Sequence, residues 1–231
     1  MQINEWDEHY KDEKYLMWWP SENLVRYISS YFNNKKDRKS INILDFGCGN
    51  GRHLRLLKES VKKYDFDINL HGVDISAHAV ELARNFLKDH RLDNENIDVY
   101  DGEKLKYENS SFNLVYSIAV LDQLKFSQAQ QLVDEIYRVL GDDGTFVLDI
   151  ELKDDSSIKE GDTLVEANTV IVSDGCEKGM YQHYFEDNEI KRLFAKWGTI
   201  NYEYETIFSR YSEMKKLSSY KRVLLTITKK R

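Results

Sequence analysis

Three glycines at alternate positions, Gly47, Gly49 and Gly51, follow directly on a short apolar run at 41–46. Beyond them begins a segment whose apolar residues recur with helical spacing. Glycine permits sharp turns and lets a ligand approach the backbone closely. A strand, a glycine turn and a helix start together form a concave surface of backbone N–H groups, which suits anionic or polar ligand parts. This loop therefore restricts both the fold and the kind of ligand.

Apolar, strand-like runs alternate with amphipathic helical segments over much of the chain. The expected strands are 41–46, 70–74, 96–100, 112–118 and 145–150. This alternation is typical of a mostly parallel sheet covered by helices. Ser76 is expected to cap one helix, and Ser127 with Gln130 to form a capping box for another, which Gly141 ends.

The last third of the chain has a different pattern. Residues 163–185 indicate two extended runs around a hairpin turn at Asp174–Gly175. A short amphipathic helix is expected at 187–197, and the runs 200–208 and 222–228 lie close enough in sequence to pair antiparallel. The sequence therefore predicts a parallel sheet that closes with an antiparallel strand pair.

Composition excludes several classes of protein. The net charge of −7 argues against the basic surface of a nucleic-acid-binding domain. No apolar run approaches the ~20 residues of a membrane span, and the N-terminus has no secretory signal. The two cysteines suggest a reduced, cytoplasmic protein, and the six histidines lack metal-ligand spacing, so no metal is expected.

The glycine spacing also distinguishes between cofactors. A dinucleotide-binding loop, G-x-G-x-x-G, requires a third glycine where this chain has Arg52 or Leu54. The chain instead has Asp45-x-Gly-x-Gly-x-Gly. This pattern resembles the first motif of the class I S-adenosylmethionine (SAM)-dependent methyltransferases, especially the small-molecule branch typified by quinone-biosynthesis and tellurite-resistance enzymes. The resemblance extends over the whole chain.

The resemblance implies SAM as cofactor and assigns roles to three acidic residues. Asp45 would hold the positive end of SAM, Asp74 both ribose hydroxyls, and Asp101 the adenine amino group beside Gly102. A strand-end carboxylate can bind two hydroxyls, although dinucleotide enzymes share that feature, and each acid could instead be an ordinary strand-end residue. Together, three acids at successive strand ends point to the ligand-binding edge of an α/β sheet. The full expected set is Asp45, Gly47, Cys48, Gly49, Asn50, Gly51, Asp74, Ile75, Asp101, Gly102, Glu103 and Ser117.

The resemblance also implies a fold and a division of the chain. The expected fold is α/β, Rossmann-like and doubly wound, with a mostly parallel seven-stranded sheet, an antiparallel last strand and an N-terminal helical lid. One domain, 1–231, would comprise the lid at 1–36, the SAM-binding core at 37–150, a substrate-side insertion at 151–185, and a C-terminal helix and strand pair at 186–231. The N-terminal segment could equally be a helix packed on the sheet rather than a lid.

The methyl acceptor is expected to be a small molecule that offers oxygen, nitrogen or sulfur. The only proline is Pro20, so the proline motifs of DNA and RNA methyltransferases of this fold cannot occur after the fourth strand. A hydroxyl or ammonium acceptor requires a general base. The candidates are Asp122 and His183, with Asp149 and Glu151 behind them, although a loop acid and a half-buried histidine are equally ordinary interpretations. Acceptor-binding residues are expected among the aromatics Trp18, Trp19 and Tyr181.

Two other functions remain open at this point. The chain could bind SAM without transferring its methyl group, as a regulatory or partner subunit. It could also be a nicotinamide oxidoreductase, which Arg52 and Leu54 disfavour. The oligomeric state is undetermined, because the alternation at 202–208 suits either an edge strand or a dimer surface.

Overall fold

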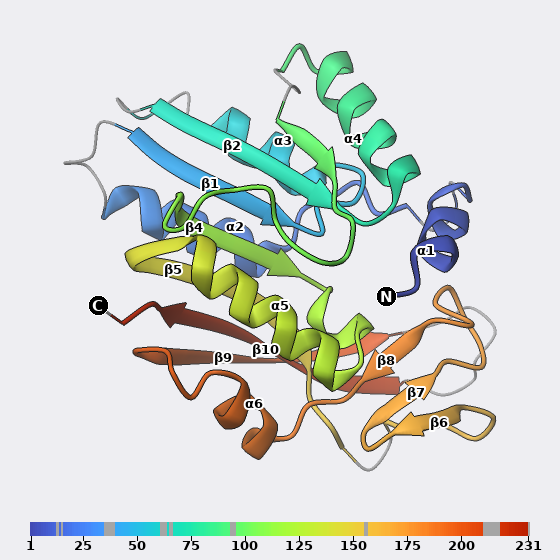
Figure 1. The fold of residues 1–231 in the computed structure, drawn as a ribbon. Helices are drawn as coiled ribbons and strands as arrows, with labels where there is room; N and C mark the ends of the chain where they lie inside the picture. Colours follow the sequence, from blue (N-terminus) through green and yellow to red (C-terminus); the bar gives the residue numbers. More distant parts are fainter. Residues whose placement is uncertain are drawn as a thin grey trace.

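The computed structural model describes residues 1–12, 14, 16–34, 40–60, 64, 67–92, 96–154, 157–209 and 218–230. In these residues a seven-stranded sheet has the order β3-β2-β1-β4-β5-β10-β9 (Figure 1). Its strands are β1 (Ser40–Phe46), β2 (Asp67–Asp74), β3 (Ile97–Val99), β4 (Phe112–Ile118), β5 (Leu140–Glu151), β9 (Ile200–Ser209) and β10 (Ser218–Thr228). Neighbours among β1–β5 are parallel, whereas β10 is antiparallel to β5 and to β9. The predicted Rossmann-like fold is confirmed.

Helices cover both faces of this sheet (Figure 1). The apolar side chains of β1 alternate: Ile41 and Ile43 pack into the core under one set of helices, and Leu44 and Phe46 into the core under the other. This two-sided burial explains why the parallel strands appear in the sequence as continuous apolar runs. The first set is α2 (Glu22–Asn33), α3 (Arg52–Ser60) and α4 (Ala77–Asp89), and the second is α5 (Phe126–Val139) and α6 (Asp187–Leu193).

The predicted cap of α4 is confirmed, and that of α5 is wrong. The Ser76 hydroxyl accepts a hydrogen bond from the Ala79 N–H at 3.0 Å. Helix α5 instead begins at Phe126, and the N–H of Lys125 donates to the side chain of Gln128. The helix starts earlier than expected because Phe126 packs against the core. It also ends before Gly141, since Leu140 is already extended and opens β5.

The segment expected to contain two extended runs forms three strands. These are β6 (Thr163–Glu166), β7 (Thr169–Ile171) and β8 (Tyr181–His183), which pair antiparallel in a separate sheet. The additional reversal passes through Asn168, whose φ of 63° is left-handed. Asparagine adopts that conformation more readily than most residues. The Asp174–Gly175 turn lies in the connection between β7 and β8. Helix α6 is shorter than predicted and ends at Leu193.

The N-terminal segment contains two helices with different positions. Helix α2 packs on the sheet through Leu24, Ile28 and Tyr31, so this part is a packed helix. Helix α1 (Ile3–Tyr10) has no buried residue and lies near the start of α4, beside the ends of the parallel strands (Figure 1).

Two polar residues hold α1 at that edge. The Asp7 carboxylate accepts a hydrogen bond from the Ser76 hydroxyl at 2.7 Å, at the start of α4. Gln2 donates to the carbonyl of Gly179 at 2.9 Å and accepts from the N–H of Tyr181 at 2.7 Å. Helix α1 therefore bridges α4 and the β7–β8 connection. No helix within the described residues is long and apolar enough to cross a membrane.

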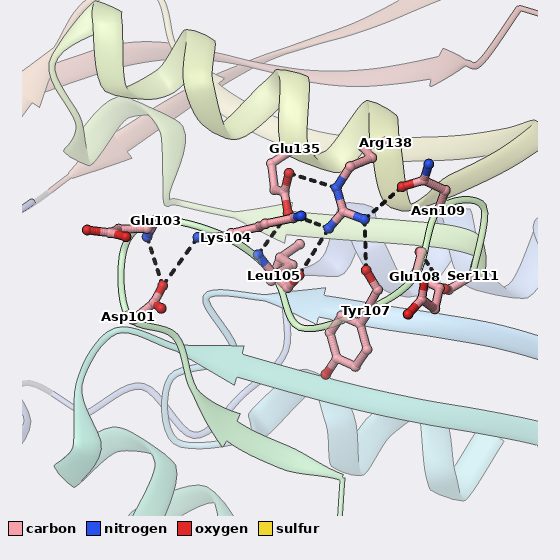
Figure 2. Close-up of polar contacts among 10 residues, drawn as sticks. All are labelled: Asp101, Glu103, Lys104, Leu105, Tyr107, Glu108, Asn109, Ser111, Glu135 and Arg138. Atoms are coloured by element: carbon pink, nitrogen blue, oxygen red, sulfur yellow. Dashed lines mark hydrogen bonds and ion pairs between the residues drawn. The ribbon is translucent and has the colours of Figure 1, made fainter.

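An ion pair on α5 holds the loop that follows β3 (Figure 2). Arg138 donates to the carboxylate of Glu135 (Nε–Oε2, 2.9 Å), to the carbonyls of Leu105 (3.0 Å) and Tyr107 (2.8 Å), and to Oδ1 of Asn109 (2.9 Å). The Glu135 carboxylate in turn accepts from the N–H of Leu105 at 2.8 Å. A planar guanidinium can satisfy several acceptors at once, which an ammonium cannot do in the same geometry.

We expect Arg138→Met to lower the free energy of unfolding by about 2 kcal/mol, because it leaves a partly buried carboxylate and two carbonyls without their donor. The control is Arg26→Met, which removes an exposed pair with Glu22 and should cost less than about 0.5 kcal/mol. Urea unfolding of both variants measures the difference. Equal effects would show that the loop does not depend on Arg138.

Candidate active site

A cavity opens at the carboxyl edge of the parallel strands. Its wall comprises the glycine loop, the ends of β2 and β4, helix α1 and the β7–β8 connection at Glu177. Open α/β sheets bind their ligands at this edge. This cavity is therefore the candidate ligand-binding site of the protein.

The glycine loop has no room for larger residues. Gly47 and Gly49 have φ values of 75° and 51°, a region that L side chains rarely adopt. A Cβ at Gly47 would lie 2.3 Å from Cγ2 of Val120, and one at Gly49 would lie 2.6 Å from the hydroxyl of Tyr10. The loop therefore requires glycine for its conformation and for its close neighbours.

Asp74, at the end of β2, ties the glycine loop to α4. Its carboxylate accepts from the N–H of Gly49 at 2.8 Å and from the N–H of Ser76 at 2.9 Å. Burial raises the pKa of Asp74 to about 6, against the lowering effect of these bonds. Asp74 also lines the cavity, so one carboxylate serves both the loop and the site.

Asp45 lies buried beside the loop without a hydrogen bond. It is 1% exposed, and among the described residues neither carboxylate oxygen has a partner. Burial raises the pKa of Asp45 to about 8, although the nearby Tyr116 hydroxyl and Arg52 oppose the shift. An unpaired buried carboxylate costs free energy unless a ligand or a proton compensates it.

The structure brings half of the expected cofactor residues to the cavity wall. Those that line it are Gly47, Cys48, Gly49, Asn50, Asp74 and Ile75. Those outside its lining are Asp45, Gly51, Asp101, Gly102, Glu103 and Ser117.

The residues outside the lining have different environments. A Cβ on Gly102 would lie 3.8 Å from Ile75, so that loop borders the cavity. Asp101 is exposed and accepts from the N–H of Glu103. Ser117 is fully buried in β4, and its hydroxyl has no partner among the described residues.

The cysteine in the loop has a structural environment. Cys48 is buried, and its Sγ would lie 3.2 Å from a Cβ on Gly72 of β2. Burial raises the pKa of the Cys48 thiol well above its ordinary value. The side chain is therefore a protonated, small packing group rather than a nucleophile.

Neither predicted general base is among the residues that line the cavity. Asp122 is fully buried and accepts from Arg222 at 2.8 Å. His183 is fully buried in the small sheet, where Nδ1 lies 2.7 Å from the Thr169 hydroxyl and Nε2 lies 3.4 Å from Glu189. The partner of Asp122 is 100 positions away in the sequence, so a local pattern cannot reveal it.

The three predicted acceptor-binding aromatics also lie outside the cavity lining. Trp18 packs against Phe86 with the two rings tilted and their centres 4.9 Å apart, and Trp19 is 81% exposed. Tyr181 faces the ammonium of Lys125, 5.2 Å from its ring centre. The aromatic wall comes instead from α1, through Trp6 and Tyr10, because the bonds of Gln2 and Asp7 fix that helix over the edge.

Several residues of the cavity wall were missed by sequence reasoning. Arg52 and His53 directly follow the last glycine, a position that could have identified them. Nε2 of His53 accepts from the N–H of Ser21 at 3.1 Å, and burial lowers the pKa of His53 well below its ordinary value. The ring is therefore neutral and carries its proton on Nδ1, so it can donate a hydrogen bond but not act as a base there. Tyr10, Gln123 and Glu177 had no local signal.

We expect Asp45→Asn to stabilise the ligand-free protein increasingly as pH rises from 5 to 8. The pKa of Asp45 is about 8 when folded against an ordinary 3.8, so between these values the folded state holds a proton that the unfolded chain has released. The wild-type free energy of unfolding therefore falls with pH, by at most about 1.4 kcal/mol per pH unit from this group, and asparagine removes that contribution. Urea unfolding across this pH range measures it.

The control for this experiment is Asp142→Asn, which changes an exposed carboxylate at the start of β5. Its difference from wild type should not grow with pH. Parallel pH curves for Asp45→Asn and wild type would refute a buried, unpaired Asp45.

Comparisons with known proteins agree with this fold. A family model for a methyltransferase domain matches residues 37–198. An uncharacterized protein of Methanocaldococcus jannaschii is 30% identical over 126 residues, which cover 54% of this chain and 43% of that protein. The chain thus spans less than half the length of this curated relative.

Solved structures share the fold at low sequence identity. A SAM-dependent methyltransferase from Methanosarcina mazei has a TM-score of 0.64 and 20% identity, covering 84% of this chain and 94% of its own. The YcgJ protein of Bacillus subtilis has a TM-score of 0.65 and 15% identity, covering 89% and 99%. Phosphoethanolamine N-methyltransferase 2 of Haemonchus contortus, in complex with SAM, has a TM-score of 0.63 and 15% identity, covering 99% and 57%.

The family model covers more than half of the chain, and the sheet order and glycine loop agree with it. The chain belongs to the methyltransferase domain family and has the fold of the class I SAM-dependent methyltransferases.

Proposed function

We propose that this protein transfers the methyl group of SAM to a small molecule. The observation that carries the proposal is the glycine loop, which lines a cavity together with Asp74 and has the unpaired Asp45 carboxylate beside it. A buried carboxylate without a partner suits a cationic ligand, and the bare loop suits one that lies against the backbone. The site therefore fits SAM.

Different residues would hold the different parts of SAM. Asp45 would compensate the ammonium and sulfonium charges, and Arg52, on the cavity wall, would pair with the carboxylate. Asp74 would bind the ribose hydroxyls. The adenine would lie between Ile75 and the loop of Asp101 and Gly102, which Arg138 holds in place (Figure 2). When bound, SAM supplies a methyl group on a sulfonium that is already a good leaving group.

The protein's own contribution is positioning and exclusion of water. Helix α1 places Tyr10 over the glycine loop, with its hydroxyl 2.6 Å from the Cβ position of Gly49. Holding two reactants in line can supply roughly 7–11 kcal/mol of a barrier. His53 would contribute a hydrogen-bond donor at the cavity wall. Because α1 has no buried residue and is joined to α4 and to the β7–β8 connection by polar contacts of Gln2 and Asp7, we propose that it acts as the lid.

Two further aspects belong to this proposal. The acceptor would be a small molecule rather than a nucleic acid, since the net charge is −7. Cys48 and Cys176 form no disulfide bond, which supports a reduced, cytoplasmic setting. Because neither Asp122 nor His183 lines the cavity, one alternative is a subunit that binds SAM without turnover.

We expect purified protein to bind S-adenosylhomocysteine at micromolar concentration in calorimetric titration and not to bind NADH. Asp74→Asn should weaken S-adenosylhomocysteine binding tenfold or more, about 1.4 kcal/mol, because an amide cannot accept from two hydroxyls and two N–H groups. Asp67→Asn, at the exposed start of the same strand, is the matched control and should bind like wild type. Binding of NADH, or of neither compound, would refute the cofactor.

A further inference from the structure

One part of the cavity wall combines a carboxylate with an unpartnered carbonyl oxygen. Gln123, in the turn after β4, and Glu177, in the β7–β8 connection, both line the cavity. Gln123 is 6% exposed, and its Oε1 has no hydrogen-bond partner among the described residues. Both groups accept hydrogen bonds, so this wall needs a ligand that donates them.

The side-chain amides of Gln182 and Gln123 are hydrogen-bonded to each other, and this bond identifies the atom of Gln123 that has no partner. The backbone carbonyl of His183 can only accept, so the atom of Gln182 that contacts it at 3.3 Å is the nitrogen. The oxygen of Gln182 must then accept from Nε2 of Gln123, at 3.0 Å. The Gln123 side chain also lies near Glu177, where it lowers the pKa of that carboxyl group against the raising effect of burial. The atom of Gln123 without a partner among the described residues is therefore its oxygen.

More carboxyl groups than cations lie behind this wall, although burial raises the pKa of Glu151 to about 8 and so keeps that group protonated at neutral pH. Arg222 lies 2.8 Å from Asp122, 3.1 Å from Asp149 and 3.8 Å from Glu151. These three carboxylates surround one guanidinium, and Glu177 adds a fourth within reach of the same charge. Lys159 is a further cation that acts on Glu177, and it is exposed. The described residues form no site that could hold a metal ion to offset the excess.

We infer that the acceptor end of the cavity binds a protonated amine through Glu177 and the Oε1 of Gln123, and that nitrogen is the atom methylated. The inference rests on the proposed function and names its acceptor class. An ammonium group supplies both what the wall lacks, a positive charge and N–H donors. A neutral hydroxyl or thiol would supply at most one donor and no charge.

Glu177 would also accept the proton that the ammonium group must lose before it can be methylated. The ammonium passes one proton to the Glu177 carboxylate and becomes an amine with a free lone pair. That lone pair forms the new N–C bond while the C–S bond of SAM breaks, and its electrons remain on sulfur. Burial raises the pKa of Glu177 above its ordinary value, which makes the carboxylate a better proton acceptor.

The first test identifies the methylated atom without knowing the acceptor. The protein is incubated with SAM carrying a ¹³C-methyl group and a small-molecule cell extract, and carbon–proton correlation spectra distinguish N-methyl, O-methyl and S-methyl products. We expect the label in an N-methyl group. An O-methyl or S-methyl product would overturn the inference and leave the proposed function intact. Absence of S-adenosylhomocysteine binding would refute the proposed function itself.

The second test measures binding, so it also tests the preference for an amine if the extract contains no acceptor. Protein saturated with S-adenosylhomocysteine is titrated with phenethylamine and with its alcohol isostere, phenethyl alcohol. The amine should bind at least tenfold more tightly, and Glu177→Gln should reduce this preference to less than threefold. Glu160→Gln, which changes an exposed glutamate, is the control and should preserve it.

Two results of the titration would overturn the inference. One is equal affinity for amine and alcohol, or a preference that survives in Glu177→Gln. The other is a loss of SAM affinity in Glu177→Gln as large as the loss of amine affinity, because the wall would then serve the sulfonium rather than an acceptor.

Discussion

The two hydrogen bonds that the Asp74 carboxylate accepts, from Gly49 and Ser76, organise the carboxyl edge of the sheet. They join the glycine loop, the end of β2 and the start of α4 at a single buried group. The Ser76 hydroxyl then donates to Asp7 of α1, so the position of α1 depends on the segment that carries the proposed ribose-binding carboxylate. If α1 is the lid, as proposed above, binding and closure would be coupled through this short segment of chain.

Buried carboxyl groups are the second feature of this edge. Asp45 has no hydrogen-bond partner among the described residues, and Asp122, Asp149 and Glu151 surround Arg222. Burial raises the pKa of Asp45 and of Glu151 to about 8, so these two groups are protonated at neutral pH in the ligand-free protein. Such groups lower stability unless something positive approaches them. SAM and an amine would each bring a positive charge, to two different parts of one cavity. The free energy that these buried carboxyl groups cost the ligand-free protein would then contribute to ligand affinity.

The sequence pattern correctly predicted features that depend on residues close together along the chain. The strand at 112–118 was predicted with its observed bounds, and the Ser76 cap was predicted correctly, because side-chain alternation and cap geometry involve only nearby residues. The start of α5 was wrong because the packing of Phe126, a long-range interaction, outweighed the Ser127 signal.

The sequence by itself determined the α/β class, the order of its strands and helices, and the loop at Gly47–Gly51, since periodicity and glycine's conformational freedom are local properties. Only the tertiary structure decided which polar groups face the cavity. Gln2 meets Gly179 from 177 positions away, and Arg222 meets Asp122 from 100. Such contacts depend on how distant segments pack. They engage Asp122 in an ion pair with Arg222 and bring Tyr10, Gln123 and Glu177 to the cavity wall.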